Sequence, residues 1–171
     1  IKKLLKKQGH EEVNVSAIKG PCLAAGLAYK MRTGTVIATQ CKKVFEAENE
    51  IEAWGDGTPI RDFIYADDVA KGMIFAVENK ITKPLNLGSG VGYTIKEVVD
   101  LVVKHSGKVL EVKWLSDKPN GDQKRLFDMS TAKSYGWEIE IGLDDGIKKT
   151  TNWFLNNKDI LDKRYNPFVN H

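Results

Sequence analysis

The stretch from Trp54 to Ala70, WGDGTPIRDFIYADDVA, constrains the fold more than any other part of the sequence. Its GDG turn separates two runs that predict short strands, IEAW and RDFIY, because glycines adopt the positive φ of tight turns without steric cost. Apolar residues at helical spacing follow at once, and Asp67 stands where a helix N-cap is expected. Short strands that alternate with helices in this way indicate an α/β class, or mixed α+β for an isolated fragment.

The rest of the chain continues this alternation. Thr94 and Glu97 form a capping box, in which each side chain bonds to the backbone of the other residue, and the helix that they open is expected to stop near Gly107. Further helices are expected at 1–12 and 36–48, together with a short helix capped by Ser130 and ended by Gly136 and a last helix from Asp144 that buries Ile147, Phe154 and Leu155. Strands are expected at 13–18, 109–115 and 125–129, and a strand with a glycine turn in 84–90. Loops are expected at 22–34 and 116–122.

Composition excludes several classes of protein. The 171 residues are 42% hydrophobic and 29% charged, with a net charge of +3, which suits a packed core. No apolar run is long enough to span a bilayer. The lysine-rich start, IKKLLKKQ, allows nucleic-acid or membrane binding, but a solvated helix end is expected, so neither partner is predicted. Cys22 and Cys41 form no CxxC motif and predict reduced thiols of a cytoplasmic protein, without a metal site.

The opening stretch also offers candidate site residues, each with an ordinary alternative. Arg61 is the candidate anion ligand, although ion pairing at the surface with a neighbouring aspartate would also explain it. Trp54 is either a platform for a ligand or a packed apolar residue. Asp67 and Asp68 look like a catalytic pair, but adjacent acids before an apolar helix usually cap it, and capping is expected. The glycines of LGSGVG lack the GxGxxG spacing and predict a tight turn.

Four segments in one order carry a family resemblance: WGDGTPIRDFIYADDVAKGM, LNLGSGVGYTIKEVVDLV, SDKPNGDQKRLFDMSTAKSYGW and LDDGIKKTTNWFL. Together they resemble the C-terminal half of extended short-chain dehydrogenase/reductases of the NAD-dependent epimerase/dehydratase family, and within it they are most similar to the GDP-L-fucose synthase group. The resemblance implies a Rossmann domain that binds NADPH and a smaller domain that closes over a nucleotide sugar. Residues 1–49 would be a remnant of the first domain, and residues 50–171 would form the second.

The resemblance further implies three binding residues. Trp54 matches a tryptophan beside the sugar pocket, Arg61 an arginine at the nucleotide diphosphate, and Lys118 a lysine in a loop that covers the substrate. The chemistry agrees, because a guanidinium fork binds diphosphate oxygens bidentately and a lysine adds a point charge. As an alternative, Lys118, Lys124 and Arg125 belong to an ordinary solvated loop. The implied partner is a GDP-sugar, and a homo-oligomer is possible.

The sequence lacks the motifs that bind the cofactor and transfer protons in this family. It contains no GxxGxxG fingerprint for a pyrophosphate and no Tyr-xxx-Lys pair, since Tyr29 and Lys30 are adjacent. Thr35 stands where the group carries a histidine that acts as the acid in the epimerisation, and threonine does not titrate near neutrality. His105 is expected to sit at a helix C-terminus, where the dipole favours a cation. We therefore expect no catalytic residue and no bound NADP in this chain.

The resulting hypothesis is the substrate-binding portion of a GDP-L-fucose synthase-like, NADPH-dependent epimerase/reductase that is inactive by itself. A non-catalytic, self-associating binding module of the same descent is the alternative, because apolar surface left by a missing half would have to be covered.

Overall fold

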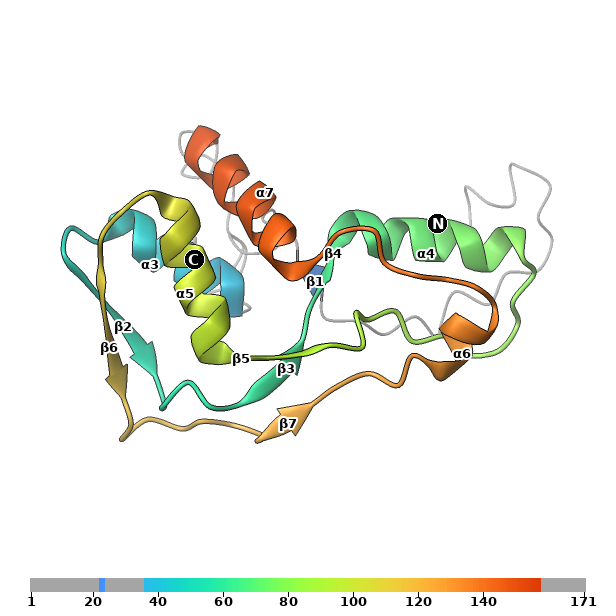
Figure 1. Ribbon diagram of the computed structural model, residues 1–171, viewed down its shortest axis with the longest axis horizontal. Helices are drawn as coiled ribbons and strands as arrows, with labels where there is room; N and C mark the ends of the chain where they lie inside the picture. The colour runs from blue at the N-terminus through green and yellow to red at the C-terminus, as the bar shows by residue number, and fades with distance from the viewer. Residues whose placement is uncertain (1–21, 24–35, 158–171) are drawn as a thin grey trace, which may run out of the picture.

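The computed structural model describes residues 22–23 and 36–157, and it confirms the mixed α/β class (Figure 1). The helix predicted at 1–12 and the strand predicted at 13–18 lie outside the described residues. The elements in chain order are β1 (Cys22–Leu23), α3 (Val36–Glu46), β2 (Glu50–Trp54), β3 (Ile60–Asp62), β4 (Ile64–Tyr65), α4 (Ala66–Glu78), β5 (Gly92–Thr94), α5 (Ile95–Ser106), β6 (Glu111–Leu115), β7 (Lys124–Arg125), α6 (Ser130–Ser134) and α7 (Leu143–Asn156).

The described strands form three small sheets. β2 pairs in parallel with β6, and β1 pairs in parallel with β4. In the third sheet, β3 lies between antiparallel β5 and parallel β7. The single strand predicted for RDFIY is wrong, because the ladder breaks at Phe63 and its two halves, β3 and β4, pair in different sheets.

A first hydrophobic core joins α3, α5 and α7 to β2 at one end of the molecule (Figure 1). The rings of Phe45 and Phe154 stack with centroids 5.1 Å apart. Cys41 is a buried free cysteine here, and burial raises the pKa of its thiol to about 12. Leu155 was expected in this core but is 36% exposed, because it follows Phe154 and so faces away from the helix side that buries Ile147 and Phe154.

A second core packs α4 against segments that come later in the chain, at the other end of the molecule (Figure 1). Leu87 and Trp137 fill this core, and Gly72 of α4 makes room for both. A Cβ at Gly72 would lie 2.7 Å from the methyl groups of Leu87 and 3.2 Å from Cε2 of Trp137. The helix therefore approaches its neighbours more closely than an alanine would permit.

The carboxylate of Asp62 connects β3 to two distant segments. Asp62 is 1% exposed and accepts hydrogen bonds from the Ser89 amide (2.8 Å), the Ser89 hydroxyl (2.6 Å) and the Gly90 amide (2.9 Å). A longer bond, 3.4 Å, comes from the Phe127 amide. The tight turn predicted for LGSGVG is confirmed, with Gly90 at φ 71°, and the anion that its amides bind is an internal carboxylate. The strand predicted in 84–90 is reduced to an isolated bridge at Asn86, and the amides of Ser89 and Gly90 bond to Asp62.

Helix termini show which local predictions succeed. The capping box at Thr94 and Glu97 is present in both directions, and α5 ends at Gly107 with φ 71°. The N-caps predicted at Asp67 and Ser130 are wrong: α4 begins after Tyr65 and α6 after Met129, and neither cap residue bonds through its side chain.

Two aspartates near these termini bond elsewhere. Asp68 is 1% exposed, and its oxygens accept the amides of Glu140 (3.3 Å) and Ile141 (3.0 Å), so it tethers α4 to a distant segment. Asp128 accepts the Ser130 amide at 2.9 Å, which turns the chain into α6. Both acids act as structural acceptors of backbone amides.

Other boundaries are shorter than predicted. Of the strand predicted at 125–129, only Arg125 is in a strand, since β7 is Lys124–Arg125. Of the strand predicted at 109–115, Glu111–Leu115 is observed. The loop predicted at 22–34 contains the two-residue strand β1, which pairs with β4. Among the described residues there is no helix able to span a membrane and no cluster of potential metal ligands.

His105 links two helices. Its Nε2 lies 3.0 Å from Oδ1 of Asp144 in the first turn of α7, and Nζ of Lys104 lies 3.1 Å from the same oxygen. These partners, His105 first, lower the pKa of Asp144. The end of α5 therefore places the ammonium of Lys104 and the ring of His105 against an aspartate in the first turn of α7. The dipole of α5 favours the ammonium at its C-terminus, and that of α7 favours the carboxylate at its N-terminus.

Replacing Asp62 by asparagine should reduce the free energy of unfolding by about 3 kcal/mol, because an NH₂ group would face backbone donors in a buried site. Urea unfolding followed by circular dichroism measures the change. Asp100→Asn, an exposed position in the middle of α5, is the control and should stay within about 0.5 kcal/mol of the parent. Equal unfolding midpoints for the two variants would contradict the role assigned to Asp62.

Candidate functional site

Two loops lie side by side between the β2–β6 sheet and the β3 sheet. We call residues 55–59 and 116–123 the paired loops. At one end the Gly55 amide bonds to the Leu115 carbonyl (2.9 Å), and at the other the Ile60 amide bonds to the Gln123 carbonyl (2.8 Å). Between them, Oδ1 of Asn120 accepts the Asp56 amide at 2.9 Å. The loops run along the lower edge of the molecule in Figure 1.

Arg61 lies in the middle of β3, where the sheet fixes its direction. It stands opposite Tyr93 of β5 and Arg125 of β7, so these three side chains share one face of the sheet. The guanidinium donates from Nη1 to the Ile60 carbonyl at 2.8 Å. It forms no ion pair with any described acid, Asp62, Asp67 and Asp68 included. The alternative of a surface ion pair is therefore wrong for the described part of the chain.

Trp54 is the last residue of β2 and is 64% exposed. Ile51 and Ala53 of the same strand are buried, and alternation along the strand turns Trp54 to the opposite face. The alternative in which Trp54 packs in the core is therefore wrong. A large aromatic surface is left facing solvent where β2 enters the paired loops.

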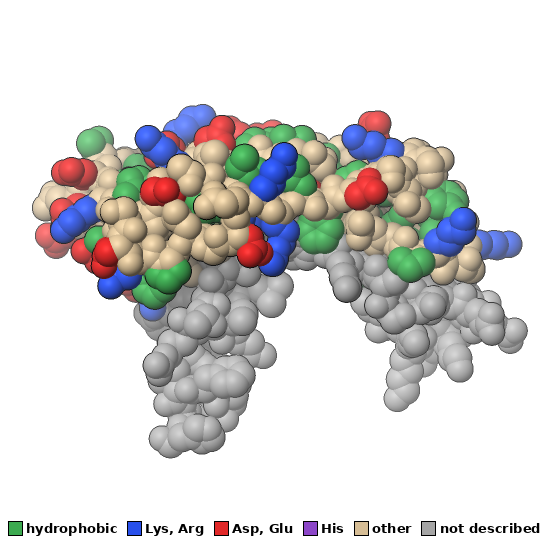
Figure 2. Space-filling view, turned by 90° about the horizontal axis from the view of Figure 1, so that it is seen from below, with side chains coloured by type: hydrophobic (Ala, Val, Ile, Leu, Met, Phe, Trp, Pro, Cys, Tyr) green, Lys and Arg blue, Asp and Glu red, His purple; other side chains and the backbone are tan. Residues whose placement is uncertain are grey.

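Lys118 lies in the second of the paired loops. Its Nζ is 3.2 Å from a carboxylate oxygen of Asp117, and its side chain is partly exposed. Arg125 pairs with Asp122, whereas Lys96 and Lys124 have no ion pair among the described residues. Figure 2, which views the molecule from the side of β3 and β7, shows Lys and Arg side chains near the middle of that face.

The structure does not assemble a catalytic pair from Asp67 and Asp68. Asp68 is buried and bonds to backbone amides, while Asp67 is exposed in the first turn of α4. Within the paired loops, Asp56 accepts the Thr58 amide (2.9 Å) and hydroxyl (2.7 Å), which lower its pKa. Asp56 therefore stays ionised at neutral pH and is not a proton donor there. The described arrangement suits anion binding by arginine and lysine better than proton transfer.

Three residues near Arg61 and the paired loops have roles that the sequence analysis did not predict. Asn120 holds the two loops together, and an Asn-Gly dipeptide signals a turn but not its partner. A Cβ placed on Gly121 would lie 3.5 Å from Nη2 of Arg61, so this turn approaches the guanidinium. Arg125 was expected at the start of a strand, with a solvated loop as the alternative, and what was missed is that β7 places it opposite Arg61.

The sequence is similar to that of known proteins. Residues 12–88 match the model of the NAD dependent epimerase/dehydratase family. The chain is 37% identical over 110 residues to a putative GDP-L-fucose synthase 2 of Arabidopsis thaliana, covering 64% of this chain and 34% of that protein. It is 34% identical over 120 residues to the GDP-L-fucose synthase of Escherichia coli (strain K12), covering 64% and 37%. The chain thus spans about a third of the length of these relatives.

A solved structure shows the same fold at lower identity. A UDP-N-acetylglucosamine 4-epimerase from Methanobrevibacter ruminantium M1, in complex with UDP-N-acetylmuramic acid, superposes with a TM-score of 0.74 at 22% identity. The match covers 90% of this chain and 51% of that one. At this identity the comparison supports the architecture and not a substrate.

Replacing Gly55 by alanine should disrupt the paired loops. Gly55 has φ 78°, and a Cβ there would lie 1.9 Å from Oδ1 of Asn120. Gly107→Ala is the matched control, because Gly107 has φ 71° but nothing within 4 Å of the added atom. The control should lower the free energy of unfolding by about 1 kcal/mol, and Gly55→Ala by about 2 kcal/mol more. Thermal unfolding of both variants checks this, and equal losses would contradict the steric argument.

Proposed function

The chain belongs to the NAD dependent epimerase/dehydratase family, and from this premise we propose that the surface around its paired loops binds a nucleotide sugar. Trp54, Arg61 and Lys118 are the proposed ligands. The parent activity would be that of a GDP-L-fucose synthase-like, NADPH-dependent epimerase/reductase. Residues 50–171 would form the sugar-nucleotide-binding domain, after a remnant of a Rossmann domain at 1–49.

One observation carries the proposal: Arg61 is a fixed cation without an acidic partner in the described structure. Its neighbour across the ladder is a second arginine, Arg125. Like charges directly opposite in a sheet repel, which favours an anion between or beside them. A diphosphate carries about two negative charges and offers oxygens that a guanidinium binds bidentately. Lys118 would add its charge from the neighbouring loop.

Trp54 suits the other part of such a ligand. Its exposed ring supplies a flat apolar surface and one N–H donor, a combination used to bind sugar rings and bases. The relatives named above are GDP-L-fucose synthases, while the solved neighbour is an epimerase for a UDP-sugar. The higher identity of the former makes GDP the first nucleotide to test.

The chemistry of the reaction does not fit the residues that this chain supplies. The sequence holds no GxxGxxG turn and no Tyr-xxx-Lys pair. The glycine turn at 88–90 donates its amides to Asp62, and a Cβ at Gly88 would lie 2.7 Å from that carboxylate, so no space is left for a phosphate. NADP therefore has no cradle among the described residues.

Two smaller parts of the proposal concern the location of the protein in the cell and its self-association. The free thiol of Cys41 agrees with a reducing, cytoplasmic location. Self-association, the alternative suggested by the sequence, stays a prediction.

Calorimetric titration of the 171-residue chain with GDP tests the binding surface. Arg61→Ala should weaken the affinity at least roughly tenfold, because a charge-assisted contact to the diphosphate is lost. Lys96→Ala removes the same charge from an exposed lysine at the start of α5 and should change the affinity by less than about twofold. Equal weakening by both variants would indicate attraction by net charge alone and refute the assigned role of Arg61.

The chain by itself should not oxidise NADPH in the presence of GDP-4-keto-6-deoxymannose. The reason is chemical, since the residues that hold the cofactor and transfer the proton in the family are missing from the sequence. The loss of NADPH absorbance measures the reaction. Oxidation that depends on the sugar nucleotide, above the level of heat-denatured chain, would show that the proposal of an inactive chain is wrong.

A further inference from the structure

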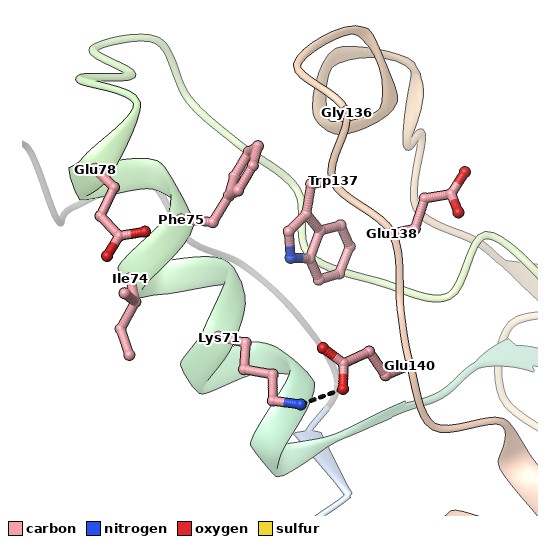
Figure 3. A pocket seen from close by; sticks show the side chains of 8 residues that line it. All are labelled: Lys71, Ile74, Phe75, Glu78, Gly136, Trp137, Glu138 and Glu140. Atoms are coloured by element: carbon pink, nitrogen blue, oxygen red, sulfur yellow. Dashed lines mark hydrogen bonds and ion pairs between the residues drawn. The ribbon is translucent and has the colours of Figure 1, made fainter.

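A pocket of about 360 Å³ lies between α4 and the segment 136–140, at the end of the molecule that holds the second core (Figure 3). None of its lining residues belongs to the paired loops. The volume is at the small end of the range for ligand sites in proteins. The pocket is therefore separate from the proposed nucleotide-sugar surface.

Part of the pocket wall is apolar and aromatic. Ile74 and Phe75 line it from α4, and Trp137 lines it from the opposite segment. Ile74 is 58% exposed, although it is a large aliphatic residue, whereas Trp137 is only 5% exposed. The pocket thus offers an aliphatic and aromatic surface on which the body of a ligand can pack.

The indole of Trp137 carries a hydrogen-bond donor that the described structure does not use. Trp137 is only 5% exposed, and none of the hydrogen bonds among the described residues uses its Nε1. The atom is not among the buried, unpartnered polar atoms of the described residues, so it reaches solvent at the pocket. Figure 3 shows this nitrogen on the side of the ring that faces α4, toward the pocket. An N–H that meets solvent at the edge of an apolar wall can donate to an acceptor of a ligand in place of water.

The charges at the pocket are mostly negative. Glu78, Glu138 and Glu140 line it together with one cation, Lys71. Lys71 pairs with Glu140, as the dashed line in Figure 3 marks. Glu78 and Glu138 have no ion pair among the described residues. The last turn of α4 contains no basic residue, so the negative end of its dipole adds to the same field.

These features together define the ligand that fits. We propose that this pocket binds a basic side chain of a peptide, with the cation held by Glu138 and Glu78 and a peptide carbonyl accepting the Nε1–H of Trp137. The aliphatic stem of an arginine or lysine packs on Ile74 and Phe75, as such stems do on apolar surfaces. A guanidinium plane also gains from the adjacent aromatic rings. An anionic ligand is disfavoured by the carboxylates.

Binding of N-acetyl-argininamide to the ¹⁵N-labelled chain tests the proposal by nuclear magnetic resonance. The indole N–H signal of Trp137, assigned by its loss in Trp137→Phe, should shift on titration. N-acetyl-citrullinamide has the same shape without the charge and should bind at least roughly fivefold more weakly. n-Butylguanidine has the same single charge without the carbonyl and should also bind more weakly than the amide, with a smaller shift of the indole signal.

Variants separate the pocket from general electrostatics. Glu138→Gln should weaken binding of N-acetyl-argininamide roughly fivefold, while Glu48→Gln, an exposed acid after α3, should change it less than about twofold. Circular dichroism verifies that both variants are folded. Absence of an indole shift, equal binding of the citrulline analogue, or equal effects of the two variants would overturn the proposal. Binding of n-butylguanidine as tight as that of the amide would overturn the peptide part of it.

Discussion

The buried carboxylate of Asp62 is the interaction on which the arrangement of this molecule depends. It gathers amides from the turn at 88–90 and from Phe127, and so holds β3 against segments that are far apart in the sequence. Neighbouring residues of a strand point to opposite faces. Because Asp62 is fixed inward, Arg61 is fixed outward, on the face that it shares with Tyr93 and Arg125. The buried carboxylate of Asp62 thereby fixes the direction in which the guanidinium of Arg61 leaves the strand.

The same feature bears on which groups the proposed nucleotide-sugar surface can use. The Ser89 and Gly90 amides of the glycine turn are already bonded to Asp62. Asp68 is likewise committed to the amides of Glu140 and Ile141. The acids that look reactive in the sequence are thus structural acceptors. What remains available to a ligand is Arg61, the exposed ring of Trp54 and the lysine of the neighbouring loop.

Local interactions could be predicted from the sequence, and distant ones could not. The capping box at Thr94 and Glu97 and the stop at Gly107 depend on residues within a few positions, so their pattern sufficed. The partners of Asp62 and Asp68 lie far along the chain, and an aspartate before a helix resembles a cap whether or not it bonds there. The site showed the same limit: Arg61 was recognised, but its pairing with Arg125 depends on the β3–β7 ladder, which no spacing reveals.

A map of GDP binding onto the chain tests most directly whether the paired loops and β3 form one nucleotide-sugar surface. Amide and indole signals of the ¹⁵N-labelled chain can be followed as GDP is added. The account predicts that the largest shifts fall in residues 54–61 and 116–125, with the indole of Trp54 among them. Shifts confined to α4 and the segment 136–140, or no shifts at all, would contradict it.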